Sequence, residues 1–365
     1  MHVDTPRPHT AIIGAGLAGS LCAHHLGASG QAVQVWDKAR GPGGRLATRR
    51  ASWAGADGTL VQAALDHGAP AFQAHTPAMQ AWVQQRLAQG ALASWPALAS
   101  PATAPEAGWL VPSPDLPALC RGLLQGSTLH TGVAVDSLQA SPQGWRLLAQ
   151  GQVLAEGLDR VLLALPPAQA APLLAPHLPA WAAVAQAAPM RPVWTLMAAT
   201  VDNGRTPPAQ AWQPSEGPLA WVMQQDRRPG RSAPPGLRLW VAHARPDWSE
   251  QQLELPADAA LAQLLAALGE ALAQALAGPP PVWAYSTAHR WRYAVPAQCA
   301  SVLQAPSGPA PDPAAAPLAW WSPALGLGVC GDFLSPSGLH AVEGAWLSAQ
   351  ALCQATHQGI AQGPG

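Results

Sequence analysis

The sequence predicts an α/β protein in which a nucleotide-binding unit with a parallel sheet is joined to a second unit of α+β type. Two observations predict this class. A glycine-rich turn near the N-terminus connects a short apolar strand to a helix, and a second apolar strand follows. Between residues 193 and 244 the pattern changes to strand-like segments separated by turns rich in Pro, Gly and Arg. A length of 365 residues is long for one domain and sufficient for two.

The individual elements follow from hydrophobic periodicity and from the glycines and prolines that end each segment. We expect strands at 10–13, 32–36, 128–138, 144–149, 161–165, 193–200, 219–224, 237–244 and 326–330. We expect a first helix that ends near residue 26, and further helices at 76–90, 114–125, 258–276 and 342–356. Ser249 and Gln252 have the spacing of a capping box, which would open another helix. Residues 304–317 form a low-complexity loop with too little hydrophobicity to pack.

Composition and charge exclude several classes of protein. A net charge of −1 provides no field that would hold nucleic acid or an anionic membrane surface. The five cysteines are scattered and lack CxxC spacing, which argues against a disulfide framework or a metal site and fits a reducing compartment. No run reaches the ~18 apolar residues that span a bilayer. The apolar stretch at 11–23 lacks the flanks of a signal peptide, so we expect a cytoplasmic protein.

The run Gly14-x-Gly16-x-x-Gly19 lies after a strand and opens a helix, as a Rossmann-type dinucleotide-binding turn requires. The first glycine makes the tight turn, the second lets backbone N–H groups approach a pyrophosphate, and the third lets helix and strand pack closely. Asp37 lies eighteen residues beyond Gly19, at the end of the second strand, where a carboxylate can accept hydrogen bonds from the adenosine ribose. Together these residues predict a dinucleotide site.

The segments beyond Asp37 favour FAD over NAD. A second glycine-rich loop, from Lys38 to Arg45, would let the chain pass close to the far half of an extended FAD. Gly331-Asp332 follows the last strand and precedes a helix whose positive end can face the flavin N1–C2=O edge. We therefore expect FAD, bound without a covalent link.

A set of longer segments, in order through nearly the whole chain, carries a resemblance to a known family. The set comprises Gly41–Arg45 with Thr48–Arg50, Leu65–Ala69, Val161–Pro166, Trp221-Val222 with Arg227–Arg231, Trp240–His243 with Asp247–Ser249, Ala288–Ala294, Gly331-Asp332 and Val342–Ser348. Of these, the Asp-His-Gly-Ala and His-Arg-Trp-Arg-Tyr-Ala segments are far more specific than the glycine-rich turn. With this set the chain resembles the renalase-like FAD-dependent oxidoreductases.

The resemblance implies a fold similar to that of the amine oxidases and p-hydroxybenzoate hydroxylase. In that fold the FAD-binding domain consists of discontinuous segments, and an α+β substrate domain with a mixed or antiparallel sheet caps the flavin. For this chain we place the FAD-binding domain at 1–72, 113–168 and 284–365, and the substrate domain at 73–112 and 169–283.

The resemblance also implies an activity, the oxidation of dihydronicotinamide isomers of NAD(P) by hydride transfer to flavin N5, with O2 as the acceptor that yields hydrogen peroxide. Loss of hydride turns a dihydropyridine directly into an aromatic pyridinium, so the reaction needs no dedicated base. Pro70-Ala71 stands where the family usually has Gln-Tyr, and the loop 333–341 is longer than expected, so the substrate can differ. Two alternatives share the cofactor motifs: a flavin amine oxidase or desaturase for another metabolite, and a non-catalytic flavin-binding protein.

The residues that we expect to bind FAD are Gly14, Ala15, Gly16, Ala18, Gly19, Asp37, Lys38, Gly44, Arg45, Leu46, Gly68, Ala69, Val133, Gly331, Asp332, Val342, Glu343 and Ala345. The candidates for the substrate pocket are His67, Trp221, His243, Arg290, Trp291 and Tyr293.

Several of these positions have two interpretations. His67 either lies by the flavin, with a covalent link as one variant, or supports a loop by hydrogen bonds; Cys330 is either a thioether site or a buried strand cysteine. The segment 289–293 either walls the pocket or forms a hinge held by cation–π packing. Arg227, Arg228 and Arg231 either clamp a phosphate of the substrate or form a solvated turn.

Overall fold

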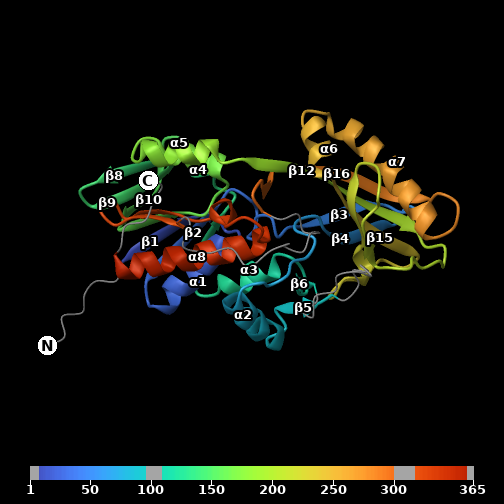
Figure 1. Cartoon of the computed structure of the whole chain (residues 1–365), viewed down its shortest axis with the longest axis horizontal. Coiled ribbons are helices and arrows are strands. Elements are labelled where there is room, and N and C mark those ends of the chain that lie inside the picture. Colours follow the sequence, from blue (N-terminus) through green and yellow to red (C-terminus); the bar gives the residue numbers. More distant parts are fainter. Residues whose placement is uncertain (1–7, 96–108, 300–316, 360–365) are drawn as a thin grey trace.

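The computed structural model describes residues 8–95, 109–299 and 317–359, which form two lobes built on two separate sheets (Figure 1). The expected low-complexity loop lies outside these residues, apart from its last position, 317. Among the described residues, no helix is long and apolar enough to cross a membrane. The same residues contain no group of three or more His, Cys, Asp or Glu side chains that could hold a metal ion.

The first lobe contains a six-stranded sheet in the order β17-β18-β11-β1-β2-β7. Neighbouring strands run parallel except for the antiparallel pair β17–β18. Parallel strands are buried on both faces, which explains why the central strands are continuous apolar runs. The strands are β1 (His9–Ile13), β2 (Ala32–Asp37), β7 (Thr128–Thr131), β11 (Arg160–Leu163), β17 (Trp320–Ser322) and β18 (Leu327–Val329).

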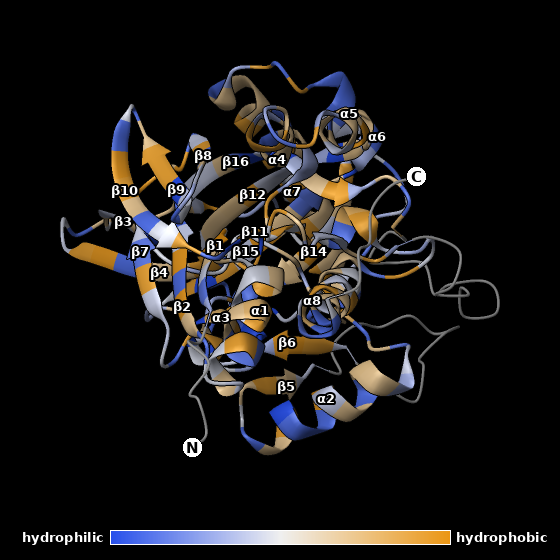
Figure 2. Ribbon diagram, turned by 90° about the vertical axis from the view of Figure 1, so that its left-hand side faces the viewer, coloured by the Kyte–Doolittle hydropathy of each residue, from blue (hydrophilic) through white to orange (hydrophobic). Residues whose placement is uncertain are grey.

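Alternate residues of these strands enter two separate cores. Ile12 and Leu162 pack with the helices of one face, whereas Ala11 and Val161 pack on the other. The first face carries α1 (Leu17–Ala28), α2 (Pro77–Ala88), α3 (Ala118–Leu123) and α8 (Ala341–Gln358). The second face carries the antiparallel strands β8 (Ser137–Ser141), β9 (Gly144–Ala149) and β10 (Gln152–Leu158), with α4 (Pro167–Leu174) and α5 (Pro179–Ala187). Helices α1 and α8 lie side by side in both views (Figures 1 and 2).

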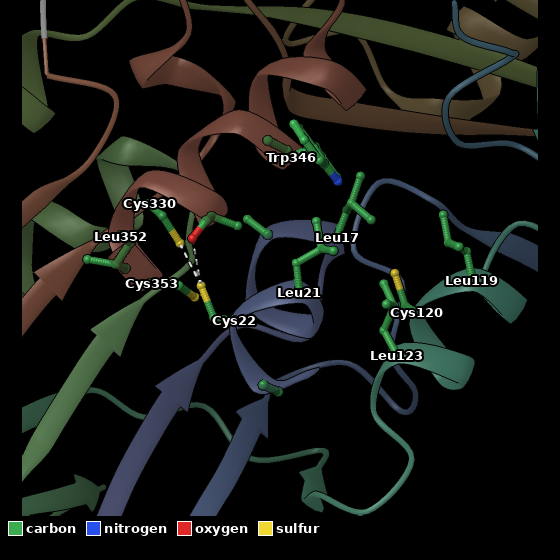
Figure 3. Close-up of a cluster of buried hydrophobic side chains, with 14 of the residues drawn as sticks. Leu17, Leu21, Cys22, Leu119, Cys120, Leu123, Cys330, Trp346, Leu352 and Cys353 are labelled. Atoms are coloured by element: carbon green, nitrogen blue, oxygen red, sulfur yellow. Dashed lines mark hydrogen bonds between the residues drawn. The ribbon is translucent and has the colours of Figure 1, made fainter. Parts of the chain in front are cut away.

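The contact between α1 and α8 contains three thiols (Figure 3). Cys22 Sγ lies 3.8 Å from Cys330 Sγ and 3.9 Å from the carbonyl oxygen of Ala349, and Cys353 packs beside them. Contact with Cys330 and burial together raise the pKa of Cys22, so this thiol stays protonated. All five cysteines are free and buried, and Cys330 is therefore a core thiol at the end of β18.

The second lobe contains a five-stranded antiparallel sheet in the order β13-β14-β15-β12-β16. One face packs against α6 and α7 through Trp194, Trp240 and Leu268. The opposite face, with Met197 and Val241, packs on the hairpin β3–β4, which lies between the lobes (Figure 1). The strands of this sheet are β12 (Met190–Val201), β13 (Ala211–Trp212), β14 (Leu219–Gln224), β15 (Leu237–Ala244) and β16 (Trp283–Pro296), and its helices are α6 (Pro246–Gln251) and α7 (Ala257–Ala275). Two separate hairpins are β3 (Thr48–Ala54) with β4 (Leu60–Asp66) and β5 (Leu92–Ser94) with β6 (Leu110–Pro112). The short 3-10 turns are η1 (Gln225–Arg227), after β14, and η3 (Asp332–Leu334), which packs with the first lobe.

The capping box expected at Ser249 is wrong. Helix α6 begins earlier, at Pro246 after the N-cap Arg245, because proline presets the helical φ of the first position. Ser249 lies inside that helix, and its Oγ accepts a hydrogen bond from the backbone N–H of Trp194. The serine therefore joins α6 to β12.

The expected domain boundaries do not coincide with the packing units. Helix α2, placed in the substrate domain, buries Met79 and Val83 in the same core as α1 and α8. Helices α4 and α5, placed there too, pack on the six-stranded sheet. Strand β16, placed in the FAD-binding domain from 284 on, instead pairs with β12 in the five-stranded sheet. The packing of these segments therefore differs from the domain division expected from the sequence.

A buried carboxylate connects α8 to the start of α2. Glu343 is fully buried, and its oxygens accept hydrogen bonds from the backbone N–H groups of His75 and Thr76 and from the Thr76 hydroxyl. The His75 ring nitrogen Nδ1 lies 3.0 Å from the same carboxylate. Burial alone would raise the pKa of Glu343, but these hydrogen bonds outweigh burial and lower it.

We expect Glu343→Gln to lower the free energy of unfolding by about 1–3 kcal/mol at pH 7, because a buried charge-assisted network loses its acceptor. The lowered pKa means that this stabilisation is present above the ordinary carboxyl pKa and is lost as the pH falls below it. The difference between variant and wild type should therefore shrink toward pH 4. Urea unfolding at pH 7 and pH 4 measures both effects. The exposed Glu270→Gln on α7 is the control, and equal midpoints for the two variants at pH 7 would contradict the assignment.

Candidate functional site

The three glycines of the first turn differ in whether the fold requires glycine at their positions. Gly14 has φ +108°, and a Cβ there would lie 2.3 Å from the carbonyl oxygen of Ala164. A Cβ on Gly19 would lie 1.9 Å from the carbonyl oxygen of Gly14, so the fold itself requires glycine at both positions. Gly16 has φ −74°, and its Cβ would meet only Gly44 Cα at 3.8 Å. Neither backbone nor packing requires glycine at 16, which is what a closely approaching ligand would explain.

Gly16 is also the N-cap of α1, and it provides no side-chain cap for the helix. The first turn contains no acidic residue, so its N–H groups and the helix dipole remain available to an anion. The second glycine-rich loop lies directly against this turn, since Gly43 N–H donates to the carbonyl of Ala15 at 2.8 Å. A Cβ on Gly44 would lie 3.1 Å from Gly16 Cα. The two glycine-rich segments therefore form one surface.

Asp37 braces this surface from the end of β2. Its Oδ2 accepts from the backbone N–H of Ala15 and its Oδ1 from that of Ala39, both at 2.7 Å. A carboxylate can accept about four hydrogen bonds, so Asp37 can still bind ribose hydroxyls. Val133 lies next to it, with its N–H donating to the Asp37 carbonyl at 3.1 Å. Lys38 points elsewhere, because its Nζ donates to the Gln169 side chain on α4.

Arg45 and Asp332 form a two-pronged ion pair, at 2.6 and 2.7 Å. Arg45 Nη1 also donates to the carbonyl of Ala294 at 3.0 Å, so the pair connects the glycine-rich loop, β16 and η3. Burial would lower the pKa of Arg45, but Asp332 outweighs burial and raises it. Ala69 lies beside this pair, since its N–H donates to the carbonyl of Arg45 at 2.9 Å.

The remaining expected FAD residues divide into two groups. Gly68 fits closely against the loop, because a Cβ there would lie 2.1 Å from the Arg45 carbonyl oxygen. Gly331 is buried, and its N–H donates to Ser348 Oγ at 2.9 Å. The side chains of the other group pack in or against the apolar core of the first lobe and are Ala15, Ala18, Leu46, Val342 and Ala345. The carboxylate of Glu343 is engaged by His75 and Thr76, so its role in the structure is to hold α2.

Polar side chains gather on one face of the five-stranded sheet. Thr195 on β12 is in register with His243 on β15 and with His289 on β16, so the three share a face. Trp221 on β14 is in register with His243. His67, which follows β4, packs against His289 with ring centroids 4.9 Å apart.

Four buried polar atoms on this face have no hydrogen-bond partner among the described residues. They are His67 Nδ1, Thr195 Oγ1, Trp221 Nε1 and His243 Nε2, and we refer to these four residues as the polar cluster. A buried polar group without a partner costs about 1–3 kcal/mol, so four of them together indicate a ligand face. Burial lowers the pKa of His67 to about 4 and that of His243 to about 3, so both rings are neutral at pH 7.

The structure separates the expected substrate residues into two sets. His67, Trp221, His243 and Trp291 share the polar face, where Trp291 Nε1 donates to the carbonyl of His67 at 3.1 Å. Arg290 lies on the opposite face of the sheet from the polar cluster, because side chains alternate along a strand. There its guanidinium lies 5.5 Å from the Trp194 ring and donates to the carbonyl of Leu253.

The segment 289–293 has side chains on both faces of the sheet. Trp291 faces the polar cluster, whereas Arg290 and Arg292 brace the segment between α6 and α7, with Arg292 binding Glu254 at 2.8 and 2.9 Å. Tyr293 is half-buried beyond a register shift between β12 and β16.

Sequence reasoning did not single out Thr195 and His340, which both have buried polar atoms without a partner among the described residues. Thr195 lies in an apolar strand, where threonine looks like a strand former, and only the register reveals its neighbours. His340 is the N-cap of α8, and both of its ring nitrogens are buried with no hydrogen-bond partner in the described part of the chain. Burial lowers the pKa of His340 to about 4. Its place in the unusual loop 333–341 was the available signal.

Comparisons with known proteins show the family and the fold of the chain. The sequence profile of the NAD(P)-binding Rossmann-like domain matches residues 12–86, and that of the flavin containing amine oxidoreductases matches residues 115–357.

Solved structures of other proteins share the fold. An oxidoreductase from Methanosarcina mazei is 16% identical with a TM-score of 0.60, covering 94% of this chain and 99% of its own. A putative protoporphyrinogen oxidase from Exiguobacterium sp. 255-15 is 12% identical with a TM-score of 0.65, covering 98% and 100%. Cyclohexylamine oxidase from Brevibacterium oxydans IH-35A is 15% identical with a TM-score of 0.57, covering 97% and 99%.

We expect Gly16→Ala to weaken FAD binding by roughly ten-fold or more, because the new methyl group would meet the ligand rather than the protein. The apoprotein should unfold at nearly the wild-type temperature, since the Cβ has ordinary space in the fold. Fluorescence titration of apoprotein with FAD and thermal melting measure the two effects. Gly27→Ala on the same helix is the control, because its Cβ meets nothing within 4 Å. Equal FAD affinity in both variants would contradict a pyrophosphate at Gly16.

The buried histidines predict an acid-sensitive fold. Because burial lowers the pKa of His67 and of His340 to about 4 and that of His243 to about 3, the unfolded chain binds protons that the folded chain does not. The free energy of unfolding should therefore reach its full value above about pH 6.5. It should decrease toward pH 4 by ~1.4 kcal/mol per pH unit for each histidine. His243→Gln should remove the contribution of one histidine from the slope of the free energy of unfolding against pH, whereas the exposed His9→Gln should leave that slope unchanged. Unfolding across pH 4–8 would refute this if the two variants had the same slope.

Proposed function

Because this chain belongs to the flavin containing amine oxidoreductase family, we propose that it abstracts a hydride from a small reduced substrate, namely a dihydro isomer of NAD(P). The chain is an FAD-dependent oxidoreductase. The observation that supports this substrate is the polar cluster, which offers unpaired hydrogen-bonding atoms beside aromatic rings and holds both of its histidines neutral.

The residues of the first lobe fit FAD, because Gly16 has no requirement of its own for glycine and α1 is uncapped. The α1 N-terminus and Gly44 would hold the pyrophosphate, Asp37 the adenosine ribose, and the Arg45–Asp332 pair the region between pyrophosphate and flavin. When bound, FAD supplies a two-electron acceptor that takes hydride at N5 and passes the electrons to O2.

The polar cluster would orient the substrate rather than remove a proton from it. A dihydropyridine that loses hydride becomes aromatic without giving up a proton, so hydrogen bonding and stacking are sufficient. Thr195 Oγ1 and His243 Nε2 can bond a carboxamide, and Trp221 and Trp291 can stack on a planar ring. The neutral state of His67 and His243 is what such binding needs at pH 7.

An amine substrate is the second candidate, and the family's description favours it. An ammonium group would be attracted to a free carboxylate. The carboxylate that lies beside the polar cluster, Asp66, instead accepts hydrogen bonds from Arg231 and Thr48. This pairing makes the site a poor receptor for a cation.

The proposal is tested by anaerobic titration of the yellow protein with NADH preparations enriched in the 2- and 6-dihydro isomers. We expect fast bleaching of the flavin bands with the isomers and none with ordinary NADH, followed by peroxide release on admission of O2. A flavin that stays oxidised with the isomers but bleaches with cyclohexylamine would favour the amine oxidase. A flavin that no small reductant reaches would favour the non-catalytic alternative.

Thr195→Val should slow flavin reduction by the isomers by roughly ten-fold, because a hydroxyl that bonds the substrate is lost. The same change should leave protein stability unchanged or raised, since that hydroxyl has no hydrogen-bond partner among the residues that the structure describes. Thr200→Val on the same strand is the matched control. Its Oγ1 accepts from Trp240 Nε1 at 2.9 Å, so this variant should lose stability and keep its reduction rate. Stopped-flow absorbance and thermal melting report both quantities, and a reversed pattern would refute the role of Thr195.

A further inference from the structure

Arg228 is a buried cation whose donors are all unused. It follows η1, its side chain is 1% exposed, and none of its three guanidinium nitrogens has a hydrogen-bond partner among the described residues. Its guanidinium carbon lies 5.6 Å from the Trp95 ring, and its Nε lies 3.6 Å from Asp66 Oδ2. A solvated turn, one of the two interpretations of this segment, is wrong for Arg228 and applies only to the exposed Arg227.

The charges around Arg228 do not balance. Asp66 already accepts hydrogen bonds from Arg231, at 2.9 Å to Nε, and from the Thr48 hydroxyl. Among the described residues, one carboxylate therefore faces two guanidinium groups, which leaves one buried positive charge. Burial lowers the pKa of Arg228 to about 10, so the side chain is still protonated at pH 7. A buried charge is normally paired and hydrogen-bonded, as Arg45 is with Asp332.

Arg228 belongs to the same region as the polar cluster. Asp66, which lies 3.6 Å from Arg228 Nε, directly precedes His67 in the chain. Trp95, whose ring the Arg228 guanidinium approaches, packs in the same core as Trp221. In addition to burial, the charges of His67 and Arg228 lower the pKa of His243. The groups of the cluster are neutral at pH 7, and Arg228 adds a cation at their border. Its planar fork of N–H donors matches the paired oxygens of a carboxylate or a phosphate.

We propose that Arg228 binds an oxyanion group, a phosphate or a carboxylate, carried by the substrate. This inference rests on the proposed function, because it assigns the oxyanion to a molecule that occupies the polar cluster. The Asp66–Arg231–Thr48 network positions Arg228, and the bound oxyanion completes the charge balance. A dinucleotide supplies phosphate oxygens, and a metabolite acid would supply a carboxylate.

The first experiment needs no turnover. Holoenzyme is melted with increasing inorganic phosphate, and separately acetate, at constant ionic strength. We expect the melting temperature of wild type and of the Arg227→Met control to rise with one or both anions, and Arg228→Met to lose that response. Without added anion, Arg228→Met should melt at the wild-type temperature or above, because it removes an uncompensated buried charge. An unchanged anion response in Arg228→Met, or a loss of stability with no anion response in wild type, would overturn the proposal.

The second experiment identifies the source of the oxyanion. Half-saturating concentrations for flavin reduction are compared for the dihydro-NAD isomers and for the matching dihydronicotinamide riboside, which has no phosphate. Wild type should prefer the dinucleotide by roughly ten- to a hundred-fold, and Arg228→Met should lose that preference, with partial recovery in Arg228→Lys.

The two proposals fail separately. If no isomer reduces the flavin but phosphate or acetate stabilises wild type through Arg228, the oxyanion site stands and the nicotinamide substrate falls. If acetate acts and phosphate does not, the substrate carries a carboxylate. If the isomers reduce the flavin with equal preference in wild type and Arg228→Met, the role of Arg228 is refuted.

Discussion

The ion pair between Arg45 and Asp332 holds together parts of the chain that are 287 positions apart. One partner ends the glycine-rich loop and the other begins η3, and the Arg45 guanidinium reaches the carbonyl at the end of β16 as well. The cofactor surface of the first lobe and the long strand of the second lobe therefore meet at one guanidinium. The relative position of the glycine-rich surface and the polar cluster depends on this junction.

The local part of the site could be predicted from the sequence. Turn geometry and helix packing impose glycine at 14 and 19 through contacts within a few residues or with a neighbouring strand, and the spacing alone reveals them. Asp37 was predictable for the same reason, since the end of β2 fixes its position. The buried strand before Asp332 and the amphipathic α7 and α8 followed from their hydrophobic patterns.

The candidate site of the second lobe was harder to predict, because its side chains come from strands that are distant in sequence and meet only through the register of the sheet. The placement of Arg290 depended on strand parity within β16, and a one-residue difference exchanges the two faces. Thr195 carries no distinguishing local pattern, and for Arg228 the sequence left a phosphate clamp and a solvated turn open; the significance of both residues appears as missing hydrogen-bond partners among the described residues. Glu343 lies where a cofactor ligand was expected, but α2 packs close enough to occupy its carboxylate.

The burial of the cysteines matters for an enzyme that, as proposed, releases peroxide. Peroxide oxidises thiolates, and burial suppresses that form here, raising the pKa of Cys120 and of Cys299 to about 12. All five cysteines are free and buried away from solvent. Such a protein would keep its thiols reduced while it releases peroxide.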